Sequence, residues 1–477
     1  MHGLSKHPIV LILAAAALVA VAATPTLQLS PNDGKARAVA SGEIDVEAMQ
    51  EAAVADGIAN ADAASIPVGG ADCTNGFAGP YPCENVDLES IVHLAELGGA
   101  TGADVWGWTD GKTGREIAIS SMTYGMAFVD VTDPTAPQVL GRVYVGWEGE
   151  DDDVLWRDVK VYESHAYLVS EHDATNLVIF DLTRLRGVHS DQGEFEPDAV
   201  FDGFGSAHNI AINTETGYAY VVGGDVCAGG LYMLDLSEPT APTEAGCFDG
   251  DGYTHDVQCV VYDGPDAEHR GDEICFASNE DTLTIVDVTD KANPVQLSRT
   301  GYPSAAYTHQ GWLTDDHGTF VFGDELDELL GTVSATTTYI ADVSDLDAPA
   351  TITPFTHETT SIDHNIYVHK GLIFEANYSA GLRVMDFTDE SLADGELTQV
   401  AFFDVDPGPE APAFAGAWTA YPFFRSGTIV LNSFDSGLFV LTLDESLLPP
   451  HGKGKGNGGP PQDRGNRPND GGRPADR

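Results

Sequence analysis

Four histidines recur about every fifty residues, each beside the expected start of a β-strand, as in "THDVQC" at 254–259. They are His208, His255, His309 and His364. Histidine nitrogens and carboxylate oxygens are common protein ligands of zinc-like metals. If the four side chains meet in space, they could bind one divalent metal ion, with Asp256 orienting an imidazole. The alternative is that each histidine forms structural hydrogen bonds within its own repeat.

A second polar series occupies the next position of each unit: Asp104, Asp158, Asn209, Asp256, Gln310 and Asn365, then Trp418. Asp and Asn at a strand start often accept hydrogen bonds from nearby backbone amides, so we expect mainly a capping role for them. Carboxylates at the ends of the second strands could form a further ring: Glu171, Asp225, Glu280, Glu325 and Glu375.

Aromatic side chains lie near the same strand starts: Trp106, Trp108, Trp312 and Trp418. Together with Glu325 they could bind a sugar or an apolar ligand, and packing between structural units is the alternative. Two acidic loops could hold calcium through Asp151, Asp153, Asp249 and Asp251. Neither loop has full EF-hand spacing, which favours solvated loops instead.

A repeat positions these residues. Seven segments share one apolar strand pattern that usually closes on an aspartate: "MAFVD", "LVIFD", "LYMLD", "LTIVD", "TYIAD", "LRVMD" and "LFVLT". Each unit contains four short stretches of strand pattern, separated by turns rich in Thr, Ser, Asp and Pro. Four-stranded units repeated about every fifty residues predict an all-β, seven-bladed β-propeller. Its first strands line the central channel, so equivalent positions form rings.

The ends of the repeat predict how the ring closes. The last unit is one strand short, whereas residues 85–97, "NVDLESIVHLAEL", contain an extra strand. We therefore expect this N-terminal strand to complete the last blade, because closure removes an exposed edge. The expected organisation is a signal peptide at 1–23, a flexible Ala/Asp-rich lead at 24–72, the propeller at 73–445 and a disordered Gly/Pro-rich tail at 446–477.

Longer stretches carry a family resemblance. The repeated strand resembles the LVIVD repeat, and "PCENVDL", "GYTHDVQCVVYDGPD", "YTHQGWL", "DELDEL", "DHNIYV" and "GAWTAYPFFRSGTIV" are similar to the bacterial choice-of-anchor B proteins. The resemblance covers about residues 73–445. The resemblance implies an exported β-propeller, and it does not indicate any enzymatic reaction.

The amino-acid composition indicates which partners the protein would disfavour and which compartment it would occupy. Asp and Glu number 75 against 22 Lys and Arg, a formal charge of −53 that disfavours nucleic acid and anionic lipid as partners. A folded chain this acidic is typical of a halophilic protein. The apolar run at 9–23 ends in small residues, as secretory signals do, and we expect no membrane span after its cleavage.

Six cysteines, an even number, favour disulfides in an oxidising compartment. Blade geometry predicts the pairs Cys73–Cys83, Cys227–Cys247 and Cys259–Cys275. We therefore expect a secreted, periplasmic or cell-surface protein.

Three functions fit these observations. The leading one is a binding module that holds a protein, a glycan or a small ligand at its channel. The second is a metal-dependent hydrolase, lactonase-like, with an axial His/Asp site. The third is a structural component of the cell surface or matrix.

Overall fold

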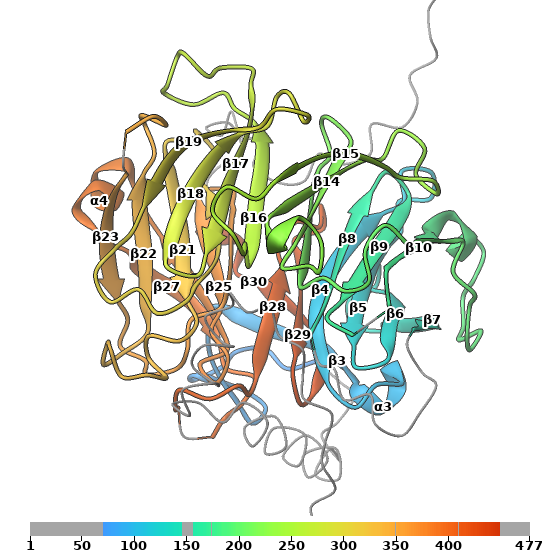
Figure 1. Ribbon diagram of the computed structural model, residues 1–477. Coiled ribbons are helices and arrows are strands. Elements are labelled where there is room, and N and C mark those ends of the chain that lie inside the picture. Colours follow the sequence, from blue (N-terminus) through green and yellow to red (C-terminus); the bar gives the residue numbers. More distant parts are fainter. Residues whose placement is uncertain (1–69, 146–155, 173, 349, 409, 449–477) are drawn as a thin grey trace, which may run out of the picture.

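The structure is a computed structural model that describes residues 70–145, 156–172, 174–348, 350–408 and 410–448 (Figure 1). The expected signal peptide, most of the expected lead and most of the expected tail lie outside these residues. Within them the strands form seven antiparallel sheets arranged as a β-propeller, as the repeat predicted. None of the described helices is long and apolar enough to cross a lipid bilayer.

The first four blades follow one another along the chain, and within each blade the strands run in chain order from the channel to the outer edge. Blade 1 contains β4 (Gly102–Thr109), β5 (Glu116–Met122), β6 (Gly125–Asp130) and β7 (Gln138–Tyr144). Blade 2 contains β8 (Arg157–Tyr162), β9 (His165–Ser170), β10 (Leu177–Asp181) and β11 (Ala199–Phe201). Blade 3 contains β12 (Asn209–Asn213), β13 (Tyr218–Val222), β14 (Leu231–Asp235) and β15 (Thr243–Phe248). Blade 4 contains β16 (Asp256–Val261), β17 (Glu273–Asn279), β18 (Thr282–Asp287) and β19 (Val295–Thr300).

The remaining three blades complete the ring. Blade 5 contains β20 (Thr308–Leu313), β21 (Thr319–Asp324), β22 (Thr337–Asp342) and β23 (Thr351–Thr356). Blade 6 contains β24 (Asn365–His369), β25 (Leu372–Ala376), β26 (Leu382–Asp386) and β27 (Thr398–Phe403). Blade 7 contains β28 (Ala417–Tyr421), β29 (Thr428–Ser433), β30 (Gly437–Leu443) and β3 (Val86–His93). The short helices are α3 (Leu94–Leu97), α4 (Asp389–Asp394), η1 (Leu182–Leu185), η2 (Cys227–Gly229) and η3 (Glu445–Leu447).

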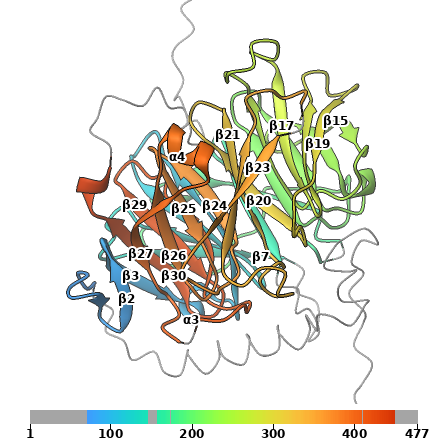
Figure 2. The same cartoon turned by 90° about the vertical axis from the view of Figure 1, so that its left-hand side faces the viewer.

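The N-terminal strand closes the ring, as expected from the missing strand of the last repeat. β3 pairs antiparallel with β30, from Val86 opposite Leu443 to His93 opposite Gly437. Figure 2 shows this blue strand beside the red β30. Blade 6 differs from the four strands expected, because β1 (Phe77–Ala78) and β2 (Tyr81–Glu84) extend it beyond β27. This hairpin covers a sheet edge that would otherwise be exposed.

The repeated aspartate has a structural role at the end of each third strand. Asp235 Oδ1 accepts a hydrogen bond from Ser237 N at 2.7 Å, and Asp287 Oδ1 accepts one from Thr289 N at 2.9 Å. This is the Asx turn that short polar side chains favour after a strand. In blade 7 the aspartate is replaced by Thr442, which donates to Glu89 Oε1 on the closing strand.

Three disulfides join the cysteines in the predicted pairs: Cys73–Cys83, Cys227–Cys247 and Cys259–Cys275. The last bridge joins directly opposed residues of β16 and β17. All six cysteines are oxidised.

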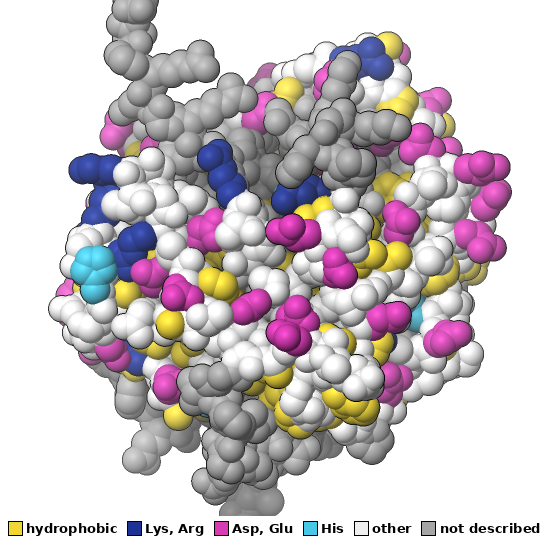
Figure 3. Space-filling view, turned by 180° about the vertical axis from the view of Figure 1, so that it is seen from behind, with side chains coloured by type: hydrophobic (Ala, Val, Ile, Leu, Met, Phe, Trp, Pro, Cys, Tyr) yellow, Lys and Arg dark blue, Asp and Glu magenta, His cyan; other side chains and the backbone are white. Residues whose placement is uncertain are grey.

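The described surface shows the acidic composition. Figure 3 shows Asp and Glu side chains dispersed over one face, whereas the Lys and Arg side chains gather in its upper half.

Candidate functional site

The seven first strands form a ring around the channel, with β4, β8, β12, β16, β20, β24 and β28 each packed against the next and β28 packed against β4. The four histidines lie at or just before the starts of β12, β16, β20 and β24. Because these strands run in the same direction, their starts meet at one end of the channel. The fold therefore converts a spacing of about fifty residues into spatial proximity.

The four imidazoles form a continuous row. Ring centroids are 4.1 Å apart for His208 and His255, 4.1 Å for His255 and His309, and 4.4 Å for His309 and His364. None of the four residues is more than 5% exposed. They surround a small cavity of about 20 Å³, together with Trp156, Arg157 and Trp418. That volume accommodates one water molecule or one ion.

Hydrogen bonds to neighbouring blades orient the imidazoles. His255 Nδ1 lies 2.8 Å from the carbonyl oxygen of His309, and His364 Nδ1 lies 2.5 Å from that of Trp418. A carbonyl oxygen only accepts, so in both residues Nδ1 carries a proton, and the neutral imidazole would then have its lone pair on Nε2. His208 Nδ1 lies 2.5 Å from Glu171 Oε1. Donation from one ring nitrogen to a carbonyl or carboxylate is how metal-binding histidines are usually held.

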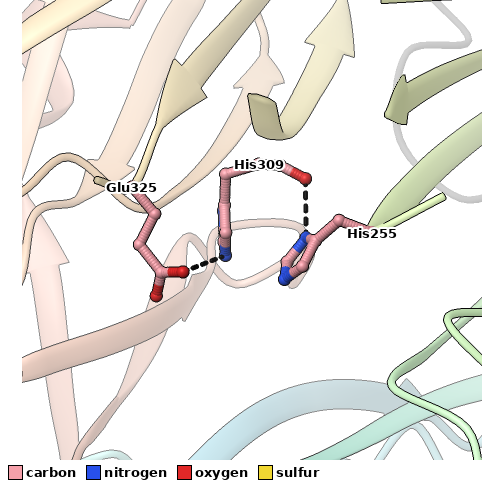
Figure 4. Close-up of side chains that lie close together, drawn as sticks. All are labelled: His255, His309 and Glu325. Atoms are coloured by element: carbon pink, nitrogen blue, oxygen red, sulfur yellow. Dashed lines mark hydrogen bonds and ion pairs between the residues drawn. The ribbon is translucent and has the colours of Figure 1, made fainter. Parts of the chain in front are cut away.

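Glu325, the residue directly after the second strand of blade 5, is the carboxylate that contacts the row at His309 and His364. Its Oε2 lies 3.8 Å from His309 Nε2, and its Oε1 lies 3.6 Å from His364 Nε2. Tyr378 OH donates to Oε1 at 2.8 Å. One ligand atom from each of His255, His309 and Glu325 lies within 4.8 Å of the other two (Figure 4). Zinc bonds of about 2.0–2.1 Å would require these atoms to close slightly further.

Asp256, expected to orient an imidazole, lies one layer further along the channel. Its Oδ1 accepts a hydrogen bond from Val257 N at 2.6 Å. The carboxylates that contact the histidines are instead Glu171 and Glu325, both from the expected ring at the ends of the second strands. Other members of that ring lie elsewhere: Asp225 accepts from Gly205 N, and Glu375 lies 3.3 Å from His357 Nε2.

The polar residues expected to cap strand starts, which we call the capping series (Asp104, Asp158, Asn209, Asp256, Gln310 and Asn365), include several that form hydrogen bonds between neighbouring blades. Asp158 Oδ2 accepts from Ile210 N at 2.8 Å, and Gln310 Oε1 accepts from Ile366 N at 2.7 Å. Asn365 Nδ2 donates to Thr419 Oγ1 rather than to Trp418, because β28 shifts register between Ala417 and Thr419. These contacts join the inner strands of blades 2 and 3, of blades 5 and 6, and of blades 6 and 7.

Two of these aspartates form a charged group with Lys160. Lys160 Nζ lies 2.9 Å from Asp104 Oδ2 and also contacts Asp158. Burial raises the pKa of Asp104 well above its ordinary value, and Lys160 opposes this shift only in part. Burial, followed by the charge of Asp158, raises the pKa of Asp256 to about 7.

A larger cavity of about 430 Å³ lies on the side of Lys160 and Asp256 away from the histidines, towards the ends of β12, β16 and β20. Its aromatic lining includes Trp106, Trp312 and Tyr367. The centroid of Tyr367 lies 5.9 Å from that of Trp106 and 5.0 Å from that of Trp312. The polar residues Lys160, Asp256, Gln258 and Gln310 also line it. Trp418 lies at the histidine end, so the expected aromatic group is divided between two sites.

Comparison with known proteins supports the repeat. The family model described as LVIVD repeat matches residues 204–250 and 270–300. The chain contains LVIVD repeats. A search of curated proteins found no match. A solved structure titled as a functionally unknown protein from Desulfotomaculum acetoxidans is similar, with 14% identity, a TM-score of 0.45, and coverage of 66% of this chain and 88% of that one.

Sequence reasoning missed several residues that line the larger cavity of this LVIVD-repeat propeller. Lys160, Gln258 and Tyr367 each lie two positions after a member of the capping series, as Trp106 and Trp312 do. Side chains at i and i+2 of a strand face the same way. Applying this alternation to all seven first strands would have found them.

Proposed function

We propose that this protein is an exported binding module that holds a small, sugar-like polar ligand in the 430 Å³ channel cavity. The observation that carries the proposal is the composition of the cavity wall. Its volume lies within the range of small-molecule sites, roughly 300–1,000 Å³, which combine aromatic walls with a few convergent polar groups.

The wall chemistry suits a saccharide. The rings of Trp106 and Trp312 offer flat apolar faces to the C–H side of a sugar. Asp256, Gln258 and Lys160 offer hydrogen-bond acceptors and donors to its hydroxyl groups. Lys160 Nζ lies 4.8 Å from the Trp106 ring centroid, which joins the polar and aromatic parts of the wall.

The compartment fits this role. Three disulfides are consistent with an extracellular or periplasmic protein. Export through a cleaved signal peptide and membership of the choice-of-anchor B family are part of the proposal and extend beyond the repeat match.

Tryptophan fluorescence titrations with a panel of mono- and oligosaccharides test the proposal. We expect saturable binding by the wild type and at least tenfold weaker binding by Trp312→Ala and Asp256→Asn. Trp418→Phe is the matched control, because Trp418 does not line this cavity, and it should bind as the wild type does. Absence of binding across the panel, or equal binding by Trp312→Ala, would overturn the proposal.

A metal-dependent hydrolase is the second candidate, favoured by the grouping of His255, His309 and Glu325 beside the small cavity. These residues would bind a zinc-like ion and leave a position for water. The ion would lower the pKa of that water and so supply a nucleophile for a lactone.

Lactone hydrolysis by zinc-loaded protein tests this alternative. His309→Gln and Glu325→Gln should each abolish it. His369→Gln is the matched control, because His369 lies at the other end of the inner strand of blade 6. Hydrolysis that survives both substitutions would remove the candidate.

A further inference from the structure

A second group of ionisable residues lies where blades 5 and 6 meet. Asp324 ends β21, Asp327 and Glu328 lie in the loop that follows, and Asp363 lies two residues before β24. The three aspartates are 0% exposed, and Glu328 is 6% exposed. One oxygen from each of Asp327, Glu328 and Asp363 lies within 4.8 Å of the other two.

Hydrogen bonds hold one side of this cluster. Tyr339 OH donates to Asp327 Oδ2 at 2.7 Å, and Thr337 N donates to Glu328 Oε1 at 2.7 Å. The other oxygens, Asp327 Oδ1 and Glu328 Oε2, are buried and accept no hydrogen bond from a residue outside the pair. The hydrogen bond between the Asp327 and Glu328 side chains requires a bound proton, because two carboxylates only accept. Buried polar atoms are almost always satisfied, so this pair must hold either a proton or a cation.

The charges around the cluster all have the same sign. Burial raises the pKa of Asp363 well above its ordinary value, and the charges of Glu328, Asp327, Asp324 and Glu375 raise it further. Burial and the charge of Asp327 raise the pKa of Glu328 to about 10. Buried carboxylates without a compensating charge are strongly unfavourable, so a cation would stabilise the group.

The backbone leaves room for this arrangement. A Cβ atom on Gly323 would lie 2.3 Å from Asp363 Oδ2. Asp324 N donates to both oxygens of Asp363, at 3.2 and 3.3 Å. The position of the Asp363 carboxyl group therefore depends on a glycine and an amide from the neighbouring blade.

We propose that Asp327, Glu328 and Asp363 form a binding site for one calcium ion. Oxygen-only ligands favour a hard cation, and calcium–oxygen bonds of about 2.3–2.6 Å allow two ligands to lie up to roughly 5 Å apart. Magnesium, with bonds of about 2.0–2.1 Å, would require a tighter group. The ion would also hold the loop that carries Glu325 beside the histidine row.

This site differs from the acidic loops that the sequence suggested. Asp251 accepts hydrogen bonds from Arg299 Nε at 2.6 Å and Thr284 Oγ1 at 2.5 Å, so its carboxylate is engaged by protein groups. Asp151 and Asp153 lie outside the described residues.

The test uses the full chain after chelation and two readouts. Terbium, a luminescent substitute for calcium, should emit when Tyr339 is excited, and calcium should displace it. Calcium should also raise the melting temperature of the wild type, whereas Asp327→Asn and Glu328→Gln should lose this rise and bind terbium at least tenfold more weakly.

Asp256→Asn is the matched control, because Asp256 is a buried carboxylate outside the cluster and should leave the calcium response unchanged. Failure of the wild type to respond to calcium or terbium would overturn the proposal. So would an undiminished calcium response in Asp327→Asn and Glu328→Gln. If both variants fail to fold, the wild-type terbium titration with calcium competition still decides the question.

Discussion

The imidazole of His255 lies tilted by 39° against that of His309, with ring centroids 4.1 Å apart, and its Nδ1 lies 2.8 Å from the His309 carbonyl oxygen. One residue thus contributes both to the row of imidazoles and to the contact between blades 4 and 5. A substitution at this position should reveal both roles.

We predict that His255→Ala lowers the free energy of unfolding by about 1–3 kcal/mol, because a buried carbonyl loses its donor. The variant should also lose any rise in melting temperature that zinc produces in the wild type. Urea denaturation with and without zinc measures both effects. His369→Ala should keep the zinc response, and an unchanged response in His255→Ala would exclude this residue as a ligand.

Stability should increase with salt. The formal charge of −53 repels itself, and at molar ionic strength the Debye length falls to about 3 Å. We expect the melting temperature to rise markedly between dilute buffer and molar sodium chloride. The same rise in potassium chloride would assign the effect to screening. A flat curve would count against salt adaptation.

Lys160→Met should be strongly destabilising at neutral pH, by about 3–5 kcal/mol, because it leaves the buried Asp104 and Asp158 without their cation. The remaining carboxyl groups would have folded pKa values raised above their unfolded values, so the loss should grow as pH rises above about 4. Denaturant unfolding at pH 4 and pH 7 measures this trend. The double variant Lys160→Met/Asp104→Asn should recover part of the loss, and a loss independent of pH would contradict the explanation.

Asp110 should increase the free energy of unfolding at neutral pH, and this contribution should disappear at acidic pH. Burial alone would raise the pKa of Asp110, but hydrogen bonds from Arg186 and Thr113 outweigh this effect and lower the pKa to about 2. A depressed folded pKa stabilises the protein above the unfolded value, about 3.9, and this stabilisation is lost as pH falls towards 2. Asp110→Asn should therefore unfold with a weaker dependence on pH between 4 and 2 than the wild type. Identical slopes would refute this assignment.

Much of the architecture was predictable from local patterns. The repeated strand motif, which usually ends in aspartate, identified seven blades because every copy is the third strand from the channel in its blade. The unpaired strand at 85–97 predicted closure, and the places of the cysteines within and beside the blades predicted the three disulfides. The added hairpin β1–β2 was missed, because two-residue and four-residue strands carry no periodic signal.

The sequence by itself determined the repeat, the closure and the set of histidines that would lie at one end of the channel. Only the tertiary structure decided which carboxylates contact them, because Glu171 and Glu325 approach from second strands whose ends depend on the twist of each blade. The same holds for Asp327 and Asp363, which are 36 residues apart in the chain and lie on different blades. Such contacts depend on how two sheets pack face to face, and neither sheet's own sequence pattern encodes that distance.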